Sequence, residues 1–274
     1  MRLSSIIAAR HRVAAIDSDV QAFATESGAT DLTGLNNLVV YLKGEGLYSS
    51  CVIYPMKSAQ NAGSGSTVYS LGGLTTVDLT IVAGAPWTSA GIDLNGTNQW
   101  MTSTVSGSNA WTELSLGARV IPDDASVTNP ATQAYVAQGT NSVTRFSFLA
   151  NGTGSISGER LVIGMQNAGT SNRKGNTTFT WTAAEDFVSS GNMKTVTMSA
   201  NGTTIPNNLT AGPATDYTPS QSGGTSDLIY HGALHTTSGG GVIPFKGVMA
   251  ASYLCNASIT NTQRHAIDGY LAAL

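Results

Sequence analysis

Paired carboxylates are the residues whose spacing would most directly indicate chemistry, because two carboxylates flanking a glycosidic bond can hydrolyse it. On a strand, such a pair needs residues that alternate onto the same face. Glu185 and Asp186 are adjacent, so they would point to opposite sides of an extended chain. Asp123 and Asp124 follow Pro122 in a stretch that is typical of a turn. The sequence therefore predicts no hydrolytic carboxylate pair.

Histidines, serines and glycines show no catalytic or metal-binding spacing either. His231 and His235 are four residues apart, but they lie in a strand-and-loop region without an acidic or thiol partner nearby. The chain contains no Gly-x-Ser-x-Gly sequence and no glycine-rich phosphate loop. We therefore expect a protein that is not an enzyme and that uses no metal ion and no cofactor.

The composition indicates a folded chain whose surface is polar but poorly charged. Of its 274 residues, 41% are hydrophobic, whereas only 11% are charged, under half of the usual ~25%. A polar surface without charge favours close packing between subunits of a lasting assembly. The net charge of −3 gives no basic stripe, so nucleic acid is not an expected partner. No apolar run approaches the ~18 residues that a membrane span needs.

Repeated strand-and-turn patterns predict that most of the chain is an antiparallel β-sandwich. Apolar and polar residues alternate at the start of the stretch 91–101, which is typical of a half-buried strand. An Asn-Gly dipeptide, which favours a tight hairpin turn, follows at Asn95 and recurs at Asn151 and Asn201. A short last helix is expected to begin at Thr260, which opens a capping box.

A heptad pattern of apolar residues near the N-terminus predicts a helix over residues 4–27. Six residues occupy its a and d positions and form what we call the N-terminal seam: Ile6, Ala9, Val13, Ile16, Val20 and Phe23. An isolated helix of this length is marginal in water, so the seam must pack against a partner surface. The partner is either a second helix, expected over residues 31–43 with a cap from Thr30 or Asp31, or other subunits.

The two cysteines allow two interpretations. Cys51 and Cys255 are either buried, reduced thiols or a disulfide between the first and last strands of the sandwich. Arg10, His11 and Arg12 interrupt the apolar core that a secretion signal would need. Synthesis in a cytosol favours reduced thiols. It also means that the six Asn-x-Ser/Thr sequences are turns rather than glycan acceptors.

Two parts of the sequence resemble known families. GIDLNGTNQWMTS at 91–103 and VIPFKGVMAASYLCNASITNTQRHAIDGYL at 242–271 are similar to the most recognisable pieces of laminin-G-like, concanavalin-A-type jelly rolls. Upstream, TDLTGLNNLVVYLKGEGLY at 30–48 and QNAGSGSTVYSLGGLTTVDLTIVAGAPW at 60–87 resemble virion-associated proteins of tailed bacteriophages. Those proteins carry a helical lead-in before a lectin-like jelly roll.

This resemblance implies both a fold and a function. The fold would be mainly β, a concanavalin-A-like jelly roll at 51–274 with a short terminal helix, preceded by a helical docking or oligomerisation segment at 1–50. The function would be that of a non-enzymatic structural component of a tailed-phage virion, of decoration or fibre type, made in the host cytoplasm. Its partners would be other virion proteins or further copies in a homo-oligomer, bound through the N-terminal seam.

A glycan-binding adhesin that recognises the host cell surface is the alternative function. Lectins with this fold bind sugars through aromatic faces and Asn or Asp side chains, often with calcium, but no dense acidic loop of the calcium-binding kind is present. Binding residues on a β scaffold tend to lie in loops, and the loops at 206–226 and 235–242 are the best places for them. Trp87, Trp100 and Trp111 are further aromatic residues that could contact a sugar. The candidate glycan-contacting residues are Trp181, Asp216, Tyr217, Asp227 and Tyr230.

Overall fold

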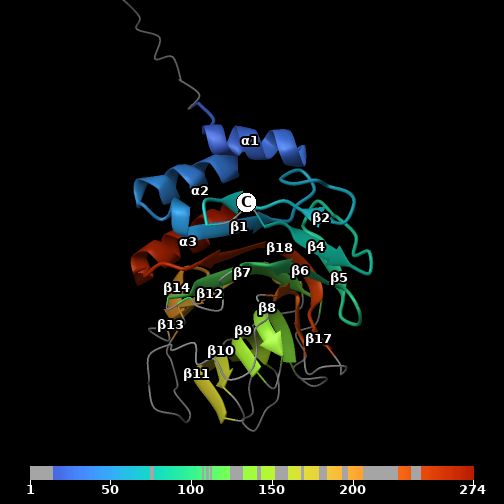
Figure 1. The fold of residues 1–274 in the computed structure, drawn as a ribbon, viewed down its shortest axis with the longest axis vertical. Coiled ribbons are helices and arrows are strands. Elements are labelled where there is room, and N and C mark those ends of the chain that lie inside the picture. The colour runs from blue at the N-terminus through green and yellow to red at the C-terminus, as the bar shows by residue number, and fades with distance from the viewer. Residues whose placement is uncertain are drawn as a thin grey trace, which may run out of the picture.

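The computed structural model has three layers, in which helices cover one sheet of a sandwich of two β-sheets (Figure 1). It describes residues 15–74, 77–106, 108, 111, 113–123, 132–140, 143–151, 160–167, 170–178, 184–192, 197–205, 228–235 and 242–274. The predicted mainly β sandwich, with helices before it and a helix after it, is confirmed. No helix of the described ranges is long and apolar enough to cross a membrane.

Sheet A carries the helices on its outer face. Its strands pair antiparallel in the order β14-β13-β12-β7-β18-β1-β3, and β5 pairs with the first half of β18. The bounds are β1 Cys51–Pro55, β3 Leu71–Gly72, β5 Ile92–Asn95, β7 Ser115–Pro122, β12 Phe187–Asn192, β13 Thr197–Ala200, β14 Thr203–Ile205 and β18 Lys246–Cys255. The first strand of the body therefore lies beside the last one.

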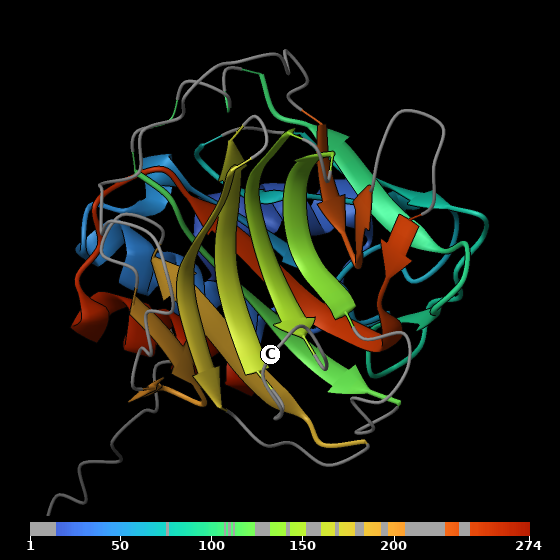
Figure 2. The same ribbon diagram turned by 90° about the horizontal axis from the view of Figure 1, so that it is seen from below.

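Sheet B forms the opposite layer of the sandwich. Its strands follow the order β11-β10-β9-β8-β15-β6-β4-β2, while β16 pairs with β17 and, through one parallel residue pair, with β8. Strands β8 to β11 run side by side in Figure 2. The bounds are β2 Thr67–Val68, β4 Leu79–Val82, β6 Trp100–Thr104, β8 Thr132–Thr140, β9 Val143–Asn151, β10 Arg160–Asn167, β11 Thr170–Thr178, β15 Leu228–His231, β16 Ala233–His235 and β17 Val242–Pro244.

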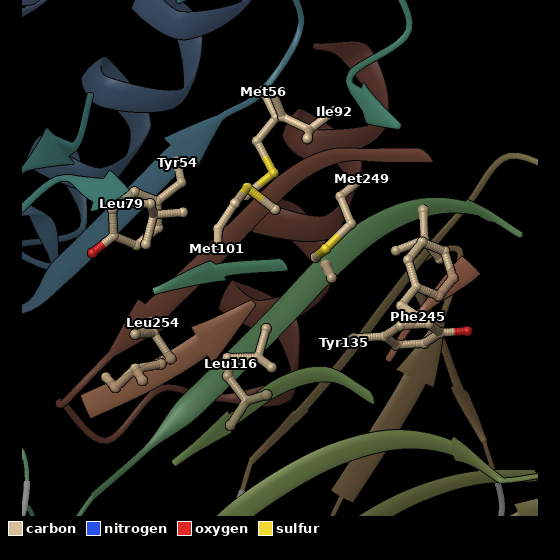
Figure 3. Packing of buried hydrophobic residues seen from close by; sticks show 14 of the residues in the cluster. Tyr54, Met56, Leu79, Ile92, Met101, Leu116, Tyr135, Phe245, Met249 and Leu254 are labelled. Atoms are coloured by element: carbon tan, nitrogen blue, oxygen red, sulfur yellow. The ribbon is translucent and has the colours of Figure 1, made fainter. Parts of the chain in front are cut away.

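The space between the sheets is a hydrophobic core with one polar bridge. Leu116 and Leu254 of sheet A share this core with Met101 of sheet B (Figure 3). Within it, Nδ1 of His231 lies 2.9 Å from the hydroxyl of Ser252, so a hydrogen bond joins the two sheets. Burial lowers the pKa of His231 to about 3, which keeps the ring neutral. His231 is thus a structural core residue.

A second hydrophobic cluster lies between sheet A and the helices. The helices are α1 Ser18–Ser27, α2 Thr33–Gly44 and α3 Asn261–Ala273, and a short 3-10 turn, η1, spans Tyr48–Ser50. The stripe of α2 contributes Leu35, Leu38, Val39 and Leu42, all of them buried. The prediction that Thr30 or Asp31 caps α2 is wrong, because the helix begins at Thr33, directly after Leu32, and no side chain caps it. Asp31 instead accepts a hydrogen bond from Nε2 of Gln60. The predicted capping box of α3 is confirmed at Thr260.

Of the predicted helix over residues 4–27, residues 4–14 lie outside the described residues, and in the described part α1 begins at Ser18. Asp17 has an extended backbone (φ −59°, ψ 144°), and its carboxylate accepts a hydrogen bond from the backbone N–H of Asp19. This side-chain cap fixes the start of α1. Ile16 therefore precedes the helix, and the heptad pattern does not run through a continuous helix into α1. Division of the chain at residue 50 stays a prediction, although the helices and the body share one hydrophobic cluster.

Both cysteines are free and buried, and they lie opposite each other on β1 and β18. The backbone N–H of Asn256 donates to the carbonyl of Ser50 beside them, so they form a non-hydrogen-bonded pair, whose side chains are close. The contact with Cys255, together with burial, raises the pKa of the Cys51 thiol. The expected proximity of the terminal strands is confirmed, with thiols in place of a disulfide.

Two of the three Asn-Gly dipeptides are described in full, and their structures differ. Asn201 and Gly202 adopt positive φ angles of 48° and 70° between the paired strands β13 and β14, which confirms a two-residue hairpin. At Asn95 the predicted hairpin is wrong, because β5 belongs to sheet A and β6 to sheet B. Asn151 ends β9, which pairs with β10 from Arg160 onward, and the residues between them lie outside the described ranges.

Candidate functional site

The outer face of sheet B is the described sheet surface that lies away from the helices. On it, the strands β4, β6 and β15 alternate between buried and solvent-reaching residues, as half-buried strands do, whereas β8 is buried from Ala134 to Gln138. On β4 the side chain of Thr80 is exposed between two buried neighbours. On β6 the residues Trp100 and Thr102 are partly exposed and Thr104 is exposed, while Met101 points into the core.

The strand register aligns four of these solvent-facing residues in one row. Thr67 on β2 lies opposite Thr80 on β4, which lies opposite Thr102 on β6, which lies opposite Tyr230 on β15. We call these four residues the threonine–tyrosine row. Neighbouring strands lie about 4.8 Å apart, so the row is roughly 14 Å long. Four residues from distant parts of the sequence thus form one continuous surface.

Two aromatic side chains lie toward one end of this row, which ends at Tyr230. Trp100 lies two residues before Thr102 on the same face of β6 and opposite Val82 of β4. It is the diagonal neighbour of Tyr230, and diagonal neighbours are about 7–8 Å apart. Partial burial raises the pKa of Tyr230, so its phenol stays protonated and can both donate and accept hydrogen bonds.

The chemistry of the row is that of binding. Threonine and tyrosine hydroxyls each donate and accept hydrogen bonds, and the rings of Trp100 and Tyr230 add apolar contact area. None of the four row residues carries a group that titrates near neutral pH, so the row supplies no general acid or base.

One of the five predicted glycan-contacting residues, Tyr230, lies in the row. Trp181, Asp216, Tyr217 and Asp227 lie outside the described residues. The three threonines of the row were missed by the sequence analysis, since their alignment depends on which strands pair and in which register. The available signal was Thr80 of β4, a polar residue between the apolar Leu79 and Ile81.

The remaining tryptophans of the described ranges pack against the core. Trp87 and Trp111 are partly buried against the cluster between the sheets. The indole N–H of Trp87 also donates to the backbone carbonyl of Gly65 at 3.0 Å. These contacts give both rings a structural role on the rim of the sandwich.

The N-terminal seam does not form a free surface in the part of the chain that is described. Val20 and Phe23 are 0% and 4% exposed, and they share a cluster with Leu35 and Leu38 of α2. Val20 and Phe23 therefore pack on the second helix of their own chain, which is one of the two partners expected for the seam. Ile16 is partly buried against the same cluster. The other three seam residues, Ile6, Ala9 and Val13, lie outside the described residues.

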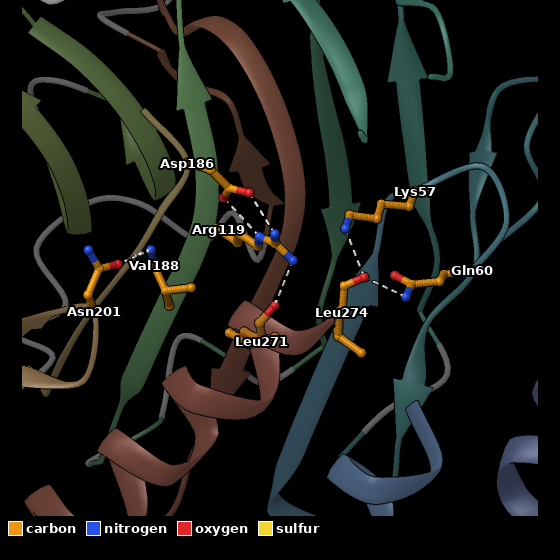
Figure 4. A network of polar contacts seen from close by, with 8 residues as sticks. All are labelled: Lys57, Gln60, Arg119, Asp186, Val188, Asn201, Leu271 and Leu274. Atoms are coloured by element: carbon orange, nitrogen blue, oxygen red, sulfur yellow. Dashed lines mark hydrogen bonds and ion pairs between the residues drawn. The ribbon is translucent and has the colours of Figure 1, made fainter. Parts of the chain in front are cut away.

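The carboxylate pairs also lie in structural contacts. Asp186 accepts two hydrogen bonds from the guanidinium of Arg119, at 2.9 and 2.6 Å (Figure 4). Arg119 in turn donates to the carbonyl of Leu271 on α3 at 3.2 Å. Asp123 pairs with Lys246 at 3.6 Å, and Asp124 lies outside the described residues. Among the described residues no group of three or more histidine, cysteine or acidic side chains could hold a metal ion.

The densest polar cluster of the described structure lies beneath α3 and is closed to solvent. Arg264 and Asp268 are 0% and 1% exposed. The hydroxyls of Ser190 and Ser199 each donate to Asp268 at 2.7 Å, while Arg264 donates to Ser199 at 3.0 Å. Burial raises the pKa of Asp268 and lowers that of Arg264. Because no ligand can reach these groups, the cluster holds α3 on sheet A.

Comparison with solved structures shows that the chain shares its fold with part of the sialidases. A trans-sialidase-active mutant of Trypanosoma rangeli sialidase is 14% identical, with a TM-score of 0.53 over 86% of this chain and 39% of the sialidase. The T. rangeli sialidase bound to 2,3-difluoro-KDN is 13% identical, with a TM-score of 0.52 over 88% of this chain and 39% of the sialidase.

This similarity is distant and concerns the fold alone. The chain spans about two fifths of the length of those enzymes. No protein-family model matches the sequence, and no curated protein matches it either.

Proposed function

We propose that this chain is a non-enzymatic, glycan-binding β-sandwich that recognises the surface of a host cell. The observation that carries this proposal is the threonine–tyrosine row, in which hydroxyls and aromatic rings share one solvent-facing sheet surface. Small polar ligands are bound by such combinations of apolar contact area and a few placed hydrogen-bonding groups. The T. rangeli sialidase, whose fold is similar, is bound to a sugar derivative in one of its structures.

A glycan array probed with the full-length chain tests this proposal. We expect binding to a restricted set of glycans, and we expect the Trp100→Ala/Tyr230→Ala double variant to lose it. Both side chains face outward, so the variant should keep its melting temperature, which is measured in parallel. The absence of any glycan signal above background for the folded wild-type chain would remove the proposal.

A second candidate is a structural component of a tailed-phage virion, of decoration or fibre type, and it is compatible with glycan binding. Two observations favour it: the resemblance of the segments 30–48 and 60–87 to phage virion-associated proteins, and the low charged content of 11%. Because Val20 and Phe23 are buried within the chain, docking onto other virion proteins or further copies would depend on Ile6, Ala9 and Val13.

Deletion of residues 1–14 tests this second candidate more sharply than deletion of all of α1 would. The residues that follow pack on the body, so the shortened chain should keep its fold and its melting temperature. We expect particles assembled with it to lack the protein, as measured by immunogold labelling against wild-type particles. Normal incorporation of the shortened chain would show that these residues are not the anchor.

A further inference from the structure

Cys51 and Cys255 lie where a disulfide could form with little movement of the backbone. They face each other in the antiparallel register of β1 and β18, as a non-hydrogen-bonded pair. The Cα atoms of such a pair are about 4.5 Å apart, which is within the range of about 4.4–6.8 Å that disulfides span. The strand register therefore brings together two thiols from the first and last strands of the body.

The two thiols are chemically unequal. The sulfur of Cys255 accepts hydrogen bonds from the thiol of Cys51 and from the backbone N–H of Ala257, and these bonds lower the pKa of Cys255 although burial opposes them. The contact with Cys255, together with burial, raises the pKa of the Cys51 thiol. Because the thiolate is the nucleophile, Cys255 is the sulfur that reacts first, while Cys51 keeps its proton.

Both thiols are buried, but they lie at the open end of the β1–β18 ladder. Cys51 begins β1 and Cys255 ends β18. The next residues outward, Ser50 and Asn256, are half-buried, and Ser49 is exposed. Fraying ends of a structure open at a lower free energy than its core strands do. An oxidant as small as hydrogen peroxide can therefore reach the sulfurs when the Ser50–Asn256 pair separates.

We propose that Cys51 and Cys255 are a peroxide-reactive dithiol that closes into a disulfide between the first and last strands of the sandwich. The thiolate sulfur of Cys255 attacks one oxygen of the peroxide, the O–O bond breaks, and the sulfur becomes a sulfenic acid as hydroxide leaves. The sulfur of Cys51 then attacks the sulfenic sulfur, so that the S–S bond forms, the S–O bond breaks and the oxygen leaves as water with the proton of Cys51. In balance, the two thiols lose two hydrogen atoms and the peroxide is reduced to two molecules of water.

This bond would enclose the sandwich in one covalent loop, because every strand of the described residues lies from Cys51 to Cys255. A disulfide stabilises mainly by restricting the unfolded chain, and it does so more strongly for a long loop. The oxidised chain should therefore melt roughly 5–10 °C higher than the reduced one. A reducing compartment keeps the two thiols apart, whereas an oxidising one joins them.

The test treats the reduced, folded, full-length chain with hydrogen peroxide and follows its intact mass. We expect the loss of two hydrogen atoms, a cross-linked pair of peptides that contain Cys51 and Cys255, and reversal by dithiothreitol. The rate should rise with the concentration of peroxide and stay unchanged when the protein is diluted, because both thiols belong to one chain. The oxidised chain should also show the higher melting temperature.

Two single variants test the order of the two steps, with circular dichroism to show that each is folded. Cys51→Ala should stop at a sulfenic acid on Cys255, which dimedone traps. Cys255→Ala should react several-fold more slowly, because burial raises the pKa of the remaining thiol. Equal rates would overturn the assignment of Cys255 as the attacking sulfur.

Three results for the wild-type chain would overturn the proposal itself. They are two thiols that still alkylate after treatment with peroxide, oxidation to sulfinic acid without the loss of two hydrogen atoms, and disulfides that form only between chains. None of these results bears on glycan binding, which is measured separately.

Discussion

The two outer faces of the sandwich differ in what covers them, and this difference separates stability from binding. On sheet A, strands β1 and β12 are buried at every position, because the core lies on one side and the helices lie on the other. On sheet B, strands β4 and β6 alternate between buried and solvent-reaching residues. Side chains that point away from the core are thus structural on β1 and β12 and reach solvent on β4 and β6.

The sequences of the strands reflect this difference. Strand β1, Cys51–Pro55, reads as a continuous apolar run, which is typical of a strand buried on both faces. Strand β6, Trp100–Thr104, places Trp100, Thr102 and Thr104 toward solvent and buries Met101 and Ser103, which is typical of one solvated face. A ligand-binding site is therefore expected on strands in which buried and solvent-reaching residues alternate. Substitutions on the two faces should therefore have opposite profiles, with stability lost on sheet A and binding lost on sheet B.

The largest loss of stability is expected from Asp268→Ala on the covered face. The substitution removes the carboxylate that accepts hydrogen bonds from the Ser190 and Ser199 hydroxyls. It also leaves the buried guanidinium of Arg264, which donates to Ser199, without a nearby negative charge. Leaving a buried charge uncompensated in this way costs about 3–5 kcal/mol. Urea unfolding followed by circular dichroism would measure the loss. A loss below 1 kcal/mol would mean that water reaches Arg264 and that α3 does not seal this part of sheet A from solvent.

The next effect is a pH-dependent change in stability that comes from His231, which forms the hydrogen bond to Ser252 between the two sheets. Burial lowers the pKa of His231 from 6.5 to about 3, so between these values the unfolded chain binds more protons than the folded one. The contribution of the neutral His231 to the free energy of unfolding is therefore fully present above pH 6.5. It is lost as pH falls toward 3, by at most about 1.4 kcal/mol per pH unit. The raised pKa of Asp268 acts with the opposite sign. Unfolding free energies of the wild type and His231→Gln at pH 7 and pH 4 isolate the histidine, because the variant should lose less on acidification.

A smaller loss is expected from Gly117→Ala, which adds one carbon to the covered face. A Cβ at this position would lie 2.5 Å from a ring carbon of Tyr253 and 2.8 Å from Cβ of Ser190. Such overpacking typically costs about 1–3 kcal/mol. Gly269→Ala on α3 is the matched control, because a Cβ there meets nothing within 4 Å and alanine favours a helix. Equal melting temperatures for the two variants would contradict the close packing at Gly117.

The Asn-Gly dipeptides show how far local sequence determines the fold. At Asn201-Gly202 the turn and the pairing of its flanking strands both follow from the dipeptide. At Asn95-Gly96 the bend also forms, with positive φ at the glycine and the Asn95 carboxamide accepting from the N–H of Thr97. Yet β5 pairs with β18 and β6 with β15, so the bend passes from one sheet to the other. Turn residues predict a bend, whereas pairing depends on partners far along the chain.

The same limit applies to the helices and to the site. Heptad spacing predicted the buried positions Val20 and Phe23, but it could not predict that Asp17 would cap the helix and leave Ile16 outside it. Single-residue chemistry identified Tyr230 as a candidate. It could not align Thr67 and Thr80 with Tyr230, because that alignment is a property of sheet register.

A weak effect is expected from Lys43→Ala, at the solvent-facing edge of the covered face. The ammonium of Lys43 lies 2.6 Å from Asp17 and 2.7 Å from Asp19, so it ties α2 to the start of α1. The lysine side chain is 34% exposed, and pairs of this kind contribute below about 1 kcal/mol. Hydrogen exchange of the α1 amides should accelerate in the variant at low salt. The difference from the wild type should shrink at 0.5 M salt, since salt screens the wild-type pairs. A salt-independent difference would instead indicate loss of the cation–π contact between the Lys43 ammonium and the Tyr48 ring.

The sharpest contrast between the faces, with Thr80→Val as the smallest effect on stability, is expected from removing one hydroxyl on each. Ser199→Ala on sheet A deletes a group that contacts Asp268 at 2.7 Å and Arg264 at 3.0 Å, so it should cost about 1–3 kcal/mol. Thr80→Val on sheet B deletes an outward hydroxyl and keeps a β-branched side chain, so unfolding free energy should change by under about 0.5 kcal/mol. Urea unfolding of both variants beside glycan titrations completes the comparison. If Thr80→Val destabilised the chain as much as Ser199→Ala, the outer face of sheet B would be a structural surface, and its hydroxyls would not be free for a ligand.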